Sequence, residues 1–174
     1  MGSHQEYWHY AGYTVVNILF SREACDRERV IDLWTRNRIL PKGVSASERA
    51  KQAVLMALDS SGQAVAVNTV YPARLRPDGA LLFFYRMFVQ PGDRVYGLMR
   101  FMTVRAWDVL SQTPMENKPA GVAIVTENRK LQRRGMVAMF EAEGWERVGG
   151  DAQGRDVWRK LFIPEKSRDH PGFF

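Results

Sequence analysis

Residues 80–89 restrict the possible folds of this chain more than any other stretch of its sequence. They read ALLFFYRMFV, so all of them except Arg86 are apolar or aromatic. Such a run is too short to span a bilayer as a helix, which takes about 20 residues, but it suits a central strand that is covered on both faces. Residues 90–97 then form a loop, and apolar residues follow at helical spacing from Leu98 onward. We therefore predict a buried strand that leads through a short loop into a helix.

The remaining elements are predicted from the same kinds of pattern. Apolar and β-branched runs predict strands at residues 13–20, 53–59, 63–75 and 121–126 and a closing hairpin at residues 146–149 and 156–162. Helical spacing predicts helices at residues 26–40, 45–51, 98–109 and 130–143. Adjacent strands favour antiparallel pairing, and the strand–helix–strand order between residues 80 and 125 favours one parallel crossover. We predict an α+β fold with a mixed, mostly antiparallel central sheet flanked by about four helices. The elements follow one another closely, so we expect a single domain at residues 5–163 with a tail at residues 164–174.

The composition excludes several other classes of protein. The chain has 174 residues, of which 45% are hydrophobic and five are tryptophan, so it can build one folded core and is not a disordered segment. Cys25 is the sole cysteine, which excludes a disulfide scaffold, and the three histidines add too few ligands for a structural zinc site. We expect no metal. No apolar run is long enough to cross a membrane and the first residues lack the apolar region of a signal peptide, so we expect a cytoplasmic protein without a membrane partner.

The chain is basic, with a formal net charge of +6 and 19 arginines among its 25 basic residues. Arginine suits fixed, two-pronged binding of phosphate or carboxylate groups. The charge is compatible with a nucleic acid, a phosphorylated cofactor or an acidic protein as the partner, and equally with a solvated surface that binds nothing. A basic cluster lies at Arg129, Lys130, Arg133 and Arg134, but no nucleic-acid-binding motif accompanies it, and we do not expect a nucleic-acid partner.

The loop between the buried strand and the following helix is the candidate binding site. The amino-terminal end of a helix has unpaired backbone N–H groups and a partial positive charge, which together attract anions such as phosphate. Gly97 would let a ligand approach the backbone closely, and Arg94 and Arg100 add positive charge. The residue types therefore suit a pyrophosphate, although a plain strand-to-helix connection explains them as well.

This loop resembles the acyl-CoA-binding motif of the GNAT superfamily of N-acetyltransferases. In that family an apolar strand ends in Val-x-Pro and is followed by (Arg or Gln)-x-x-Gly-x-(Gly or Ala), and residues 89–98 read V-x-P-x-x-R-x-x-G-L. Asn128 and the sequence F-x-x-x-G-W at residues 140–145 resemble a second region of the family, which has Asn and later Tyr-x-x-x-Gly-Phe. The order of the predicted elements also resembles the family over nearly the whole chain.

The resemblance implies that acetyl-CoA or another acyl-CoA binds between the strands at residues 80–89 and 121–126. The pantetheine would pair with the first strand, the pyrophosphate would rest on the loop, and the basic cluster would meet the 3′-phosphate of CoA or an acidic acyl carrier protein. The residues that the resemblance assigns to the acyl-CoA are Met87, Phe88, Val89, Arg94, Val95, Tyr96, Gly97, Leu98, Met99, Asn128 and Arg133. The implied reaction is transfer of the acyl group to a primary amine on a small molecule or a protein, and oligomers are compatible with the family.

Three features depart from the family pattern. Met99 stands where a second Gly or Ala is usual, so its side chain would either crowd the phosphates or point into the core. Phe140 replaces the usual Tyr and has no proton to donate to the leaving thiolate. The spacing from Asn128 to Gly144 is longer than usual. These departures keep a second interpretation open, in which the chain is a catalytically inactive GNAT-fold protein that acts in binding or as a structural module.

Four further residues are candidates for the chemistry or for the acceptor site. Glu127, at the end of the strand at residues 121–126, is the best-placed general base, or else a solvated strand end. Tyr85 either relays protons or belongs to the core. Arg86 needs a partner in so apolar a strand, and either binds a substrate carboxylate or extends to the rim of the sheet. The resemblance implies acceptor contacts from the first helices, which include Trp34.

Overall fold

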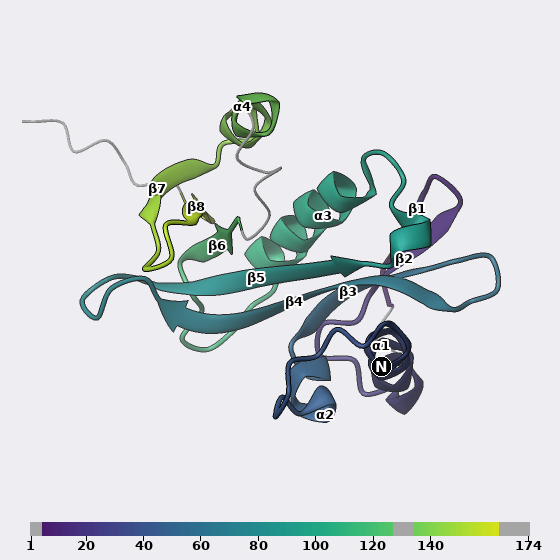
Figure 1. Ribbon diagram of the computed structural model, residues 1–174. Helices are drawn as coiled ribbons and strands as arrows, with labels where there is room; N and C mark the ends of the chain where they lie inside the picture. The colour runs from purple at the N-terminus through teal and green to yellow at the C-terminus, as the bar shows by residue number, and fades with distance from the viewer. Residues whose placement is uncertain (1–4, 127–133, 164–174) are drawn as a thin grey trace, which may run out of the picture. The chain divides into compact units, whose positions relative to one another are not determined.

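The computed structural model describes residues 5–126 and 134–163, and these have the α+β structure that the sequence predicts. Among them are four α-helices, one short 3₁₀ helix and eight strands that are mostly antiparallel. In chain order (Figure 1) the elements are β1 (Tyr7–Tyr10), β2 (Tyr13–Asn17), α1 (Ala24–Asn37), α2 (Ala46–Ala50), β3 (Ala53–Leu58), β4 (Ala64–Arg74), β5 (Leu81–Val89), η1 (Pro91–Asp93), α3 (Leu98–Gln112), β6 (Gly121–Val125), α4 (Arg134–Ala142), β7 (Glu146–Gly150) and β8 (Asp156–Leu161).

The chain divides into two compact units. Unit 1 comprises Met1–Tyr71 and Phe84–Glu116, and unit 2 comprises Pro72–Phe83 and Asn117–Phe174. The strands follow the order β1-β2-β3-β4-β5 in unit 1, although residues 72–74 of β4 and 81–83 of β5 belong to unit 2. In unit 2 the order is β6-β8-β7. The organisation of residues 5–163 as a single domain stays a prediction.

Unit 1 begins with a hairpin that the sequence did not predict. Strand β1 pairs antiparallel with β2, and the two-residue turn between Tyr10 and Tyr13 uses left-handed backbone at Ala11 and Gly12. The strand predicted at residues 13–20 ends at Asn17, because the chain turns away through the left-handed residue Phe20. The hairpin places aromatic side chains of β1 next to α3, and this proves important for the candidate site.

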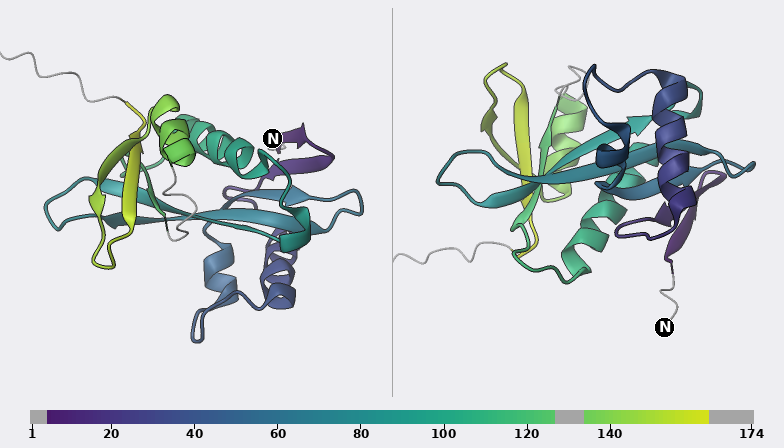
Figure 2. Two further views of the ribbon diagram at one scale, coloured as in Figure 1. Left: turned by 45° about the horizontal axis from the view of Figure 1, so that its top comes forward. Right: turned by 90° about the horizontal axis from the view of Figure 1, so that it is seen from below.

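The first two helices form close to their predicted places. Helix α1 begins at Ala24 and not at Asp26, whose buried carboxylate accepts a hydrogen bond of 2.7 Å from the Ser21 hydroxyl inside the first turn. Ser45 caps α2 by accepting a hydrogen bond of 3.2 Å from the backbone N–H of Glu48. Both helices lie on one face of the strands of unit 1, and α3 lies on the other (Figures 1 and 2).

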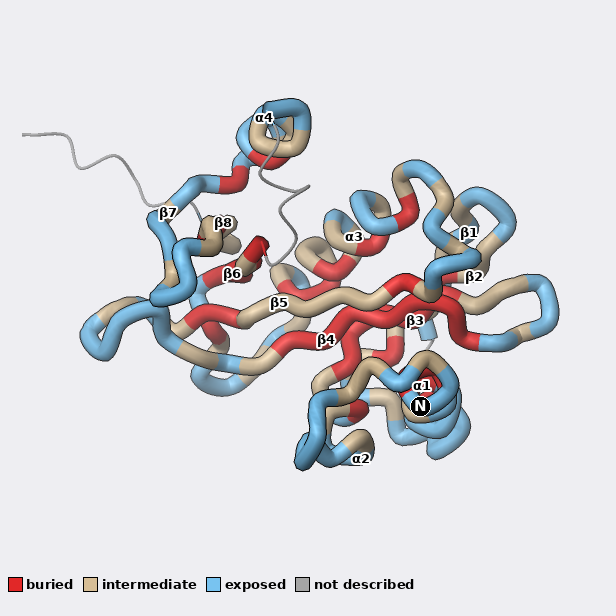
Figure 3. The backbone as a smooth tube through the Cα atoms, viewed as in Figure 1, coloured by how far each residue is buried: buried red, intermediate tan, exposed pale blue. Residues whose placement is uncertain are grey.

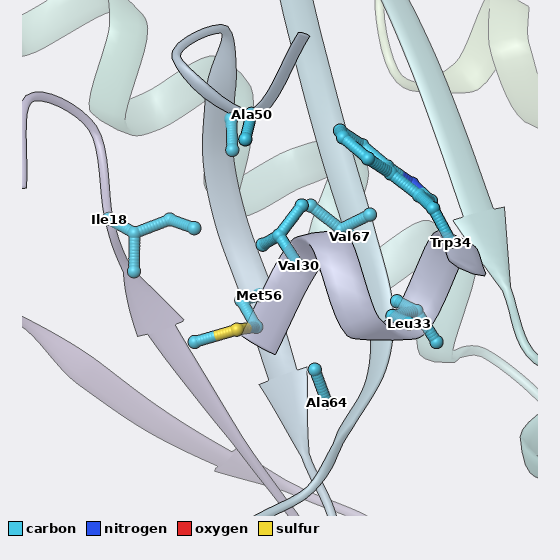
Figure 4. Close-up of a cluster of buried hydrophobic side chains, with 9 residues drawn as sticks. Ile18, Val30, Leu33, Trp34, Ala50, Met56, Ala64 and Val67 are labelled. Atoms are coloured by element: carbon cyan, nitrogen blue, oxygen red, sulfur yellow. The ribbon is translucent and has the colours of Figure 1, made fainter. Parts of the chain in front are cut away.

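The core of unit 1 lies between α1 and the strands β3 and β4. Val30, Leu33 and Trp34 of α1 pack against Met56 and Val67 (Figure 4). Strands β3 and β4 are almost wholly buried along their paired length (Figure 3), and α3 covers their other face with the predicted apolar stripe. Burial of this stripe and of the α1 cluster is the main source of stability, since apolar surface gains about 25 cal/mol per Å² removed from water.

Unit 2 has the predicted closing hairpin. Strands β7 and β8 pair antiparallel, and β8 also pairs antiparallel with β6. Gly121 is enclosed at this second pairing, where a Cβ atom would lie only 2.4 Å from the carbonyl oxygen of Lys160. Helix α4 confirms the described part of the helix predicted at residues 130–143; residues 130–133 lie outside the described residues.

Candidate functional site

The predicted strand–loop–helix segment is present and lies, from Phe84 onward, in unit 1. Strand β5 ends at Val89, the 3₁₀ helix η1 follows, and α3 begins after Gly97, which adopts left-handed backbone with φ +82°. Leu98 is fully buried and anchors the first turn of α3 in the core. The amino-terminal end of a four-turn helix therefore opens directly onto the end of β5, as the sequence predicts.

Several backbone N–H groups at this helix end are free to bind a ligand. The N–H groups of Val95 and Leu98 donate to the carbonyls of Asp93 (2.9 Å) and Val95 (3.4 Å). Those of Tyr96, Gly97 and Met99 donate to no backbone carbonyl of the described residues. Unpaired donors and the positive end of the helix dipole together make a site for an anion.

The side chains around these N–H groups leave the helix end accessible. Tyr96 is 97% exposed and Met99 is 46% exposed, so Met99 does not point into the core. Arg94 is exposed, and its Nε donates a hydrogen bond of 3.2 Å to the carbonyl oxygen of Val89. This bond holds the Arg94 side chain beside the end of β5, at Val89, one of the residues that the family resemblance assigns to the acyl-CoA.

The β1–β2 hairpin contacts this loop, and the sequence does not predict that contact. The Tyr10 hydroxyl donates a hydrogen bond of 3.1 Å to the carbonyl oxygen of Tyr96, and the Tyr10 ring stacks on Phe101 of α3 at 4.7 Å between centroids. A Cβ atom added to Gly97 would lie 2.1 Å from Tyr10 Oη. The sequence predicts that the missing side chain of Gly97 leaves room for a ligand, but Tyr10 fills that space. The positive φ of Gly97 is a second reason for glycine at this position. Ligand access is left to the N–H side of the loop.

A second set of hydrogen bonds fixes the turn at η1. Asp93 accepts from the Tyr13 hydroxyl (2.9 Å) and from Gln90 Nε2 (2.9 Å), and Gln90 Oε1 in turn accepts from Arg36 and Asn37 of α1. The hydrogen bond to Asp93 raises the pKa of Tyr13 above its ordinary value. Side chains from β2 and α1 thus hold the loop in shape before any ligand binds, which lowers the entropy cost of binding.

Strand β5 is less completely covered than predicted. Leu82, Phe83 and Val89 are buried, but residues 84–88 are only partly buried (Figure 3). The expectation of full cover on both faces is therefore wrong for the middle of the strand. Partly buried side chains with polar ends, Tyr85 and Arg86, lie in this stretch on opposite faces.

Tyr85 faces α3 and takes part in a hydrogen-bond chain. The fully buried Asn68 donates to the Tyr85 hydroxyl at 3.3 Å, and Tyr85 Oη lies 3.0 Å from Thr103 Oγ1. Because the Thr103 hydroxyl donates to the carbonyl of Met99 at 2.8 Å, its oxygen can accept from Tyr85, whose hydroxyl also has Met87 Sδ as an acceptor at 3.4 Å. Burial raises the pKa of Tyr85 to about 12. The chain explains Tyr85 as a structural residue, and its catalytic role stays a prediction.

Arg86 lies on the opposite face of β5, over an aromatic ring. Its guanidinium carbon is 3.9 Å from the centroid of the Tyr71 ring, which itself contacts the Phe84 ring at 5.6 Å. The neighbouring Phe88 packs against the core cluster under α1. Trp34 is 3% exposed in that same cluster, so packing accounts for it without an acceptor.

Three predicted site residues remain, together with Phe140, which replaces the usual Tyr of the family. Glu127, Asn128 and Arg133 lie outside the described residues. Phe140 is 6% exposed; its ring stacks on Trp158 at 5.1 Å and meets Trp145 edge-on at 6.0 Å. In the described part of unit 2, Phe140 is thus a core residue.

Two absences concern the described residues only. No group of three or more His, Cys, Asp or Glu side chains suited to a metal ion is found within residues 5–126 and 134–163. In the same ranges no helix has the length and apolar character that crossing a membrane requires.

The fold resembles solved structures of N-acetyltransferases, although no protein-family model and no curated protein matches the sequence. A ribosomal-protein-S5-alanine acetyltransferase from Vibrio fischeri aligns over 91% of this chain and 98% of its own, with 13% identity and a TM-score of 0.59. A GNAT-superfamily phosphinothricin acetyltransferase from Sinorhizobium meliloti, solved with acetyl-CoA, aligns over 86% of this chain and 88% of its own, with 14% identity and a TM-score of 0.58.

A third solved structure extends the same likeness. The dodecameric spermidine N-acetyltransferase from Vibrio cholerae aligns over 92% of this chain and 100% of its own, with 13% identity and a TM-score of 0.57. Together with the order of the elements and the strand–loop–helix segment at residues 89–98, these likenesses confirm the predicted fold: the chain has the fold of the GNAT superfamily of N-acetyltransferases.

Proposed function

We propose that this protein is an acyl-CoA-dependent N-acyltransferase that moves an acetyl group from acetyl-CoA to a primary amine. The observation that carries the proposal is the set of unpaired N–H groups at Tyr96, Gly97 and Met99, at the start of α3 and directly after β5. A structural neighbour, the phosphinothricin acetyltransferase, was solved with acetyl-CoA. The acyl-CoA supplies an activated thioester, which an amine can attack with release of the thiol.

The proposed binding residues follow from this placement. The pyrophosphate would accept hydrogen bonds from the N–H groups of the loop, with Arg94 near enough to add charge. The pantetheine would lie along the β5 backbone at Met87, Phe88 and Val89. Val95 and Leu98 would act by shaping the loop, because their N–H groups are already engaged. Asn128 and Arg133, for further cofactor contacts, and Glu127, as the general base, stay in the proposal on sequence grounds alone.

The acceptor is proposed to be an amine on a small molecule or a protein. The acetyltransferases with this fold are named for acceptors as different as a ribosomal protein, phosphinothricin and spermidine. The fold therefore does not define the acceptor, which depends on the side chains at the site. The proposal includes the cytoplasm as the compartment and leaves both a monomer and an oligomer open, since one of these neighbours is dodecameric.

A thermal-shift series tests the cofactor part of the proposal. CoA and acetyl-CoA should both raise the melting temperature, since a ligand at about 100 times its dissociation constant stabilises the folded state by about 2.7 kcal/mol. Pantetheine, which lacks the pyrophosphate, is the matched control and should give a much smaller shift. No shift with CoA at millimolar concentration, or an equal shift with pantetheine, would contradict binding at the loop.

The second candidate function is a GNAT-fold protein that binds CoA without turnover. The observation that favours it is Phe140, which has no hydroxyl and is packed between two tryptophans. Release of free thiol from acetyl-CoA across a panel of amines, amino acids and peptides separates the two candidates. Turnover supports the transferase, whereas a CoA-induced shift with no thiol release from any amine supports the binding protein.

A further inference from the structure

Arg86 is the charged residue of β5, and its side chain makes a contact with an aromatic ring. The guanidinium lies 3.9 Å from the centre of the Tyr71 ring, a cation–π contact. The residue is only partly buried, so part of it can be reached from solvent. Within residues 5–126 and 134–163 its guanidinium makes no ion pair and donates no hydrogen bond.

The other arginines on the described strands have a hydrogen-bond acceptor, and Arg74 of β4 donates to the backbone carbonyl of Gly79. Arg147 of β7 and Arg159 of β8 donate to Asp156 and Glu146, at 2.5 Å and 2.9 Å. A guanidinium that is partly withdrawn from water gains from such a partner, because charge-assisted hydrogen bonds are about twice as strong as neutral ones. No carboxylate of residues 5–126 and 134–163 pairs with Arg86 in this way.

The position of the Tyr71 ring determines which side of the Arg86 guanidinium can bind a ligand. The guanidinium carbon lies over the ring at 3.9 Å from its centroid, and the N–H groups of a guanidinium lie in the plane of the group. A carboxylate fits this arrangement, because it is planar and can accept two parallel N–H bonds from the edge of an arginine. Tyr71 acts as a positioning residue, since its ring holds the plane of the guanidinium.

We propose that Arg86 binds the carboxylate of the acyl acceptor, so that the acceptor is an amino carboxylic acid. This inference rests on the proposed transferase function. Arg86 is the residue directly before Met87, where the proposed pantetheine contact begins, so a bound amino acid would lie close to the proposed path of the acyl-CoA. Tyr85, on the other face of β5, is held by Asn68 and Thr103 and is separate from this contact.

The test compares amino acids with their carboxamides as acceptors, measured as thiol release from acetyl-CoA. The acid-to-carboxamide ratio of kcat/KM should be about tenfold or more higher in the wild-type protein than in Arg86→Met. This variant keeps an apolar stem without the charge, and should lower kcat/KM for the acids much more than for the carboxamides. Arg86→Lys should restore part of the preference, since it keeps the charge but not the fork. Using the ratio in variant and wild type removes the effect of the lower basicity of the carboxamide's amine.

The CoA-induced thermal shift of each variant separates the two proposals. An unchanged CoA-induced shift with a lowered acid-to-carboxamide ratio in Arg86→Met supports the Arg86 site, whereas the same ratio in the wild-type protein and in Arg86→Met overturns it and leaves the transferase intact. If no acceptor is turned over, saturation-transfer NMR on the same pairs measures binding directly. Binding of acids but not carboxamides, lost in Arg86→Met, then supports the site, and its absence overturns it. No shift with CoA contradicts the transferase, whichever result the acids give.

Discussion

Replacing Gly97 with alanine tests how the β1–β2 hairpin holds the loop before α3. Gly97 has φ +82°, and left-handed backbone costs a residue with a side chain about 1–2 kcal/mol. The new Cβ atom would also lie 2.1 Å from Tyr10 Oη and 3.2 Å from Tyr10 Cζ, so the Tyr10 ring has to move. This movement would break the hydrogen bond to Tyr96 and weaken the stacking on Phe101, each worth about 0.5–1.5 kcal/mol. We expect Gly97→Ala to lower the free energy of unfolding by about 2–4 kcal/mol.

Two further variants separate the strain from the clash. Gly62, in the turn between β3 and β4, has φ +80° but no heavy atom within 4 Å of a built Cβ, so Gly62→Ala should cost the backbone strain alone, about 1–2 kcal/mol. Tyr10→Phe removes the hydroxyl that Gly97→Ala would strike. In the Tyr10→Phe background, Gly97→Ala should therefore cost about 1 kcal/mol less than it does in the wild-type protein.

Urea unfolding of the single and double variants gives these differences, and the CoA-induced thermal shift of each folded variant reports on the loop. The expected pattern is a larger cost for Gly97→Ala than for Gly62→Ala, and a positive coupling with Tyr10. Equal costs at the two glycines, or additive effects of Gly97→Ala and Tyr10→Phe, would refute the contact between the hairpin and the loop.

The remaining predictions concern stability at other glycines and an acidic turn. Gly121→Ala should destabilise the protein by about 1–3 kcal/mol in urea unfolding, because its Cβ would lie 2.4 Å from the carbonyl oxygen of Lys160. The matched Gly135→Ala has open space in an exposed part of α4 and should instead stabilise by about 0.5–1 kcal/mol; a cost there would contradict the described helix. The hydrogen bond from Ser61 lowers the pKa of Asp59, so the folded state binds its proton less readily than the unfolded state. The stability that Asp59→Asn removes at neutral pH should accordingly shrink as pH falls below about 4, and a difference that stays constant down to pH 2 would disprove this reading.

The parts of the fold that the sequence predicts are those that local pattern decides. The strands β3, β4 and β5 and the helix α3 lie within one or two residues of their predicted ends, except that α3 runs on to Gln112, because each is a continuous apolar run or a clear stripe. Strand β1 was missed because its four residues, YWHY, show no alternation of apolar and polar side chains. The signal that could have found it is Gly12, which suits the positive φ of a two-residue hairpin turn; Ala11, at the other turn position, is not one of the residues such turns favour.

In the candidate site, too, the parts that are local in the chain are predicted from the sequence and the long-range contacts are not. The end of β5, the loop and the start of α3 are consecutive in the chain, so their order alone places them together. The contact of Tyr10 with the loop joins residues 86 positions apart, and the Asn68–Tyr85–Thr103 chain joins three separate elements. Contacts of this kind depend on the packing of α3 across the strands, and nothing in the local sequence of Tyr10 or Asn68 indicates the partner.

Phe140 and Tyr85 are the aromatic residues that the sequence brings into question as proton donors to the leaving thiolate, and their state bears on the pH dependence of the proposed reaction. Phe140 has no hydroxyl, and the Tyr85 hydroxyl, with a pKa of about 12, is hydrogen-bonded to Asn68 and Thr103. A hydroxyl with that pKa does not titrate in the range of ordinary assays, so the acceptor amine, which reacts only when unprotonated, should set the profile. kcat/KM should therefore rise with pH, level off near the pKa of each amine, and move with that pKa from one acceptor to another. A fall between about pH 9 and 11 that disappears in Tyr85→Phe would show instead that Tyr85 leaves its hydrogen-bond chain and supplies the proton itself.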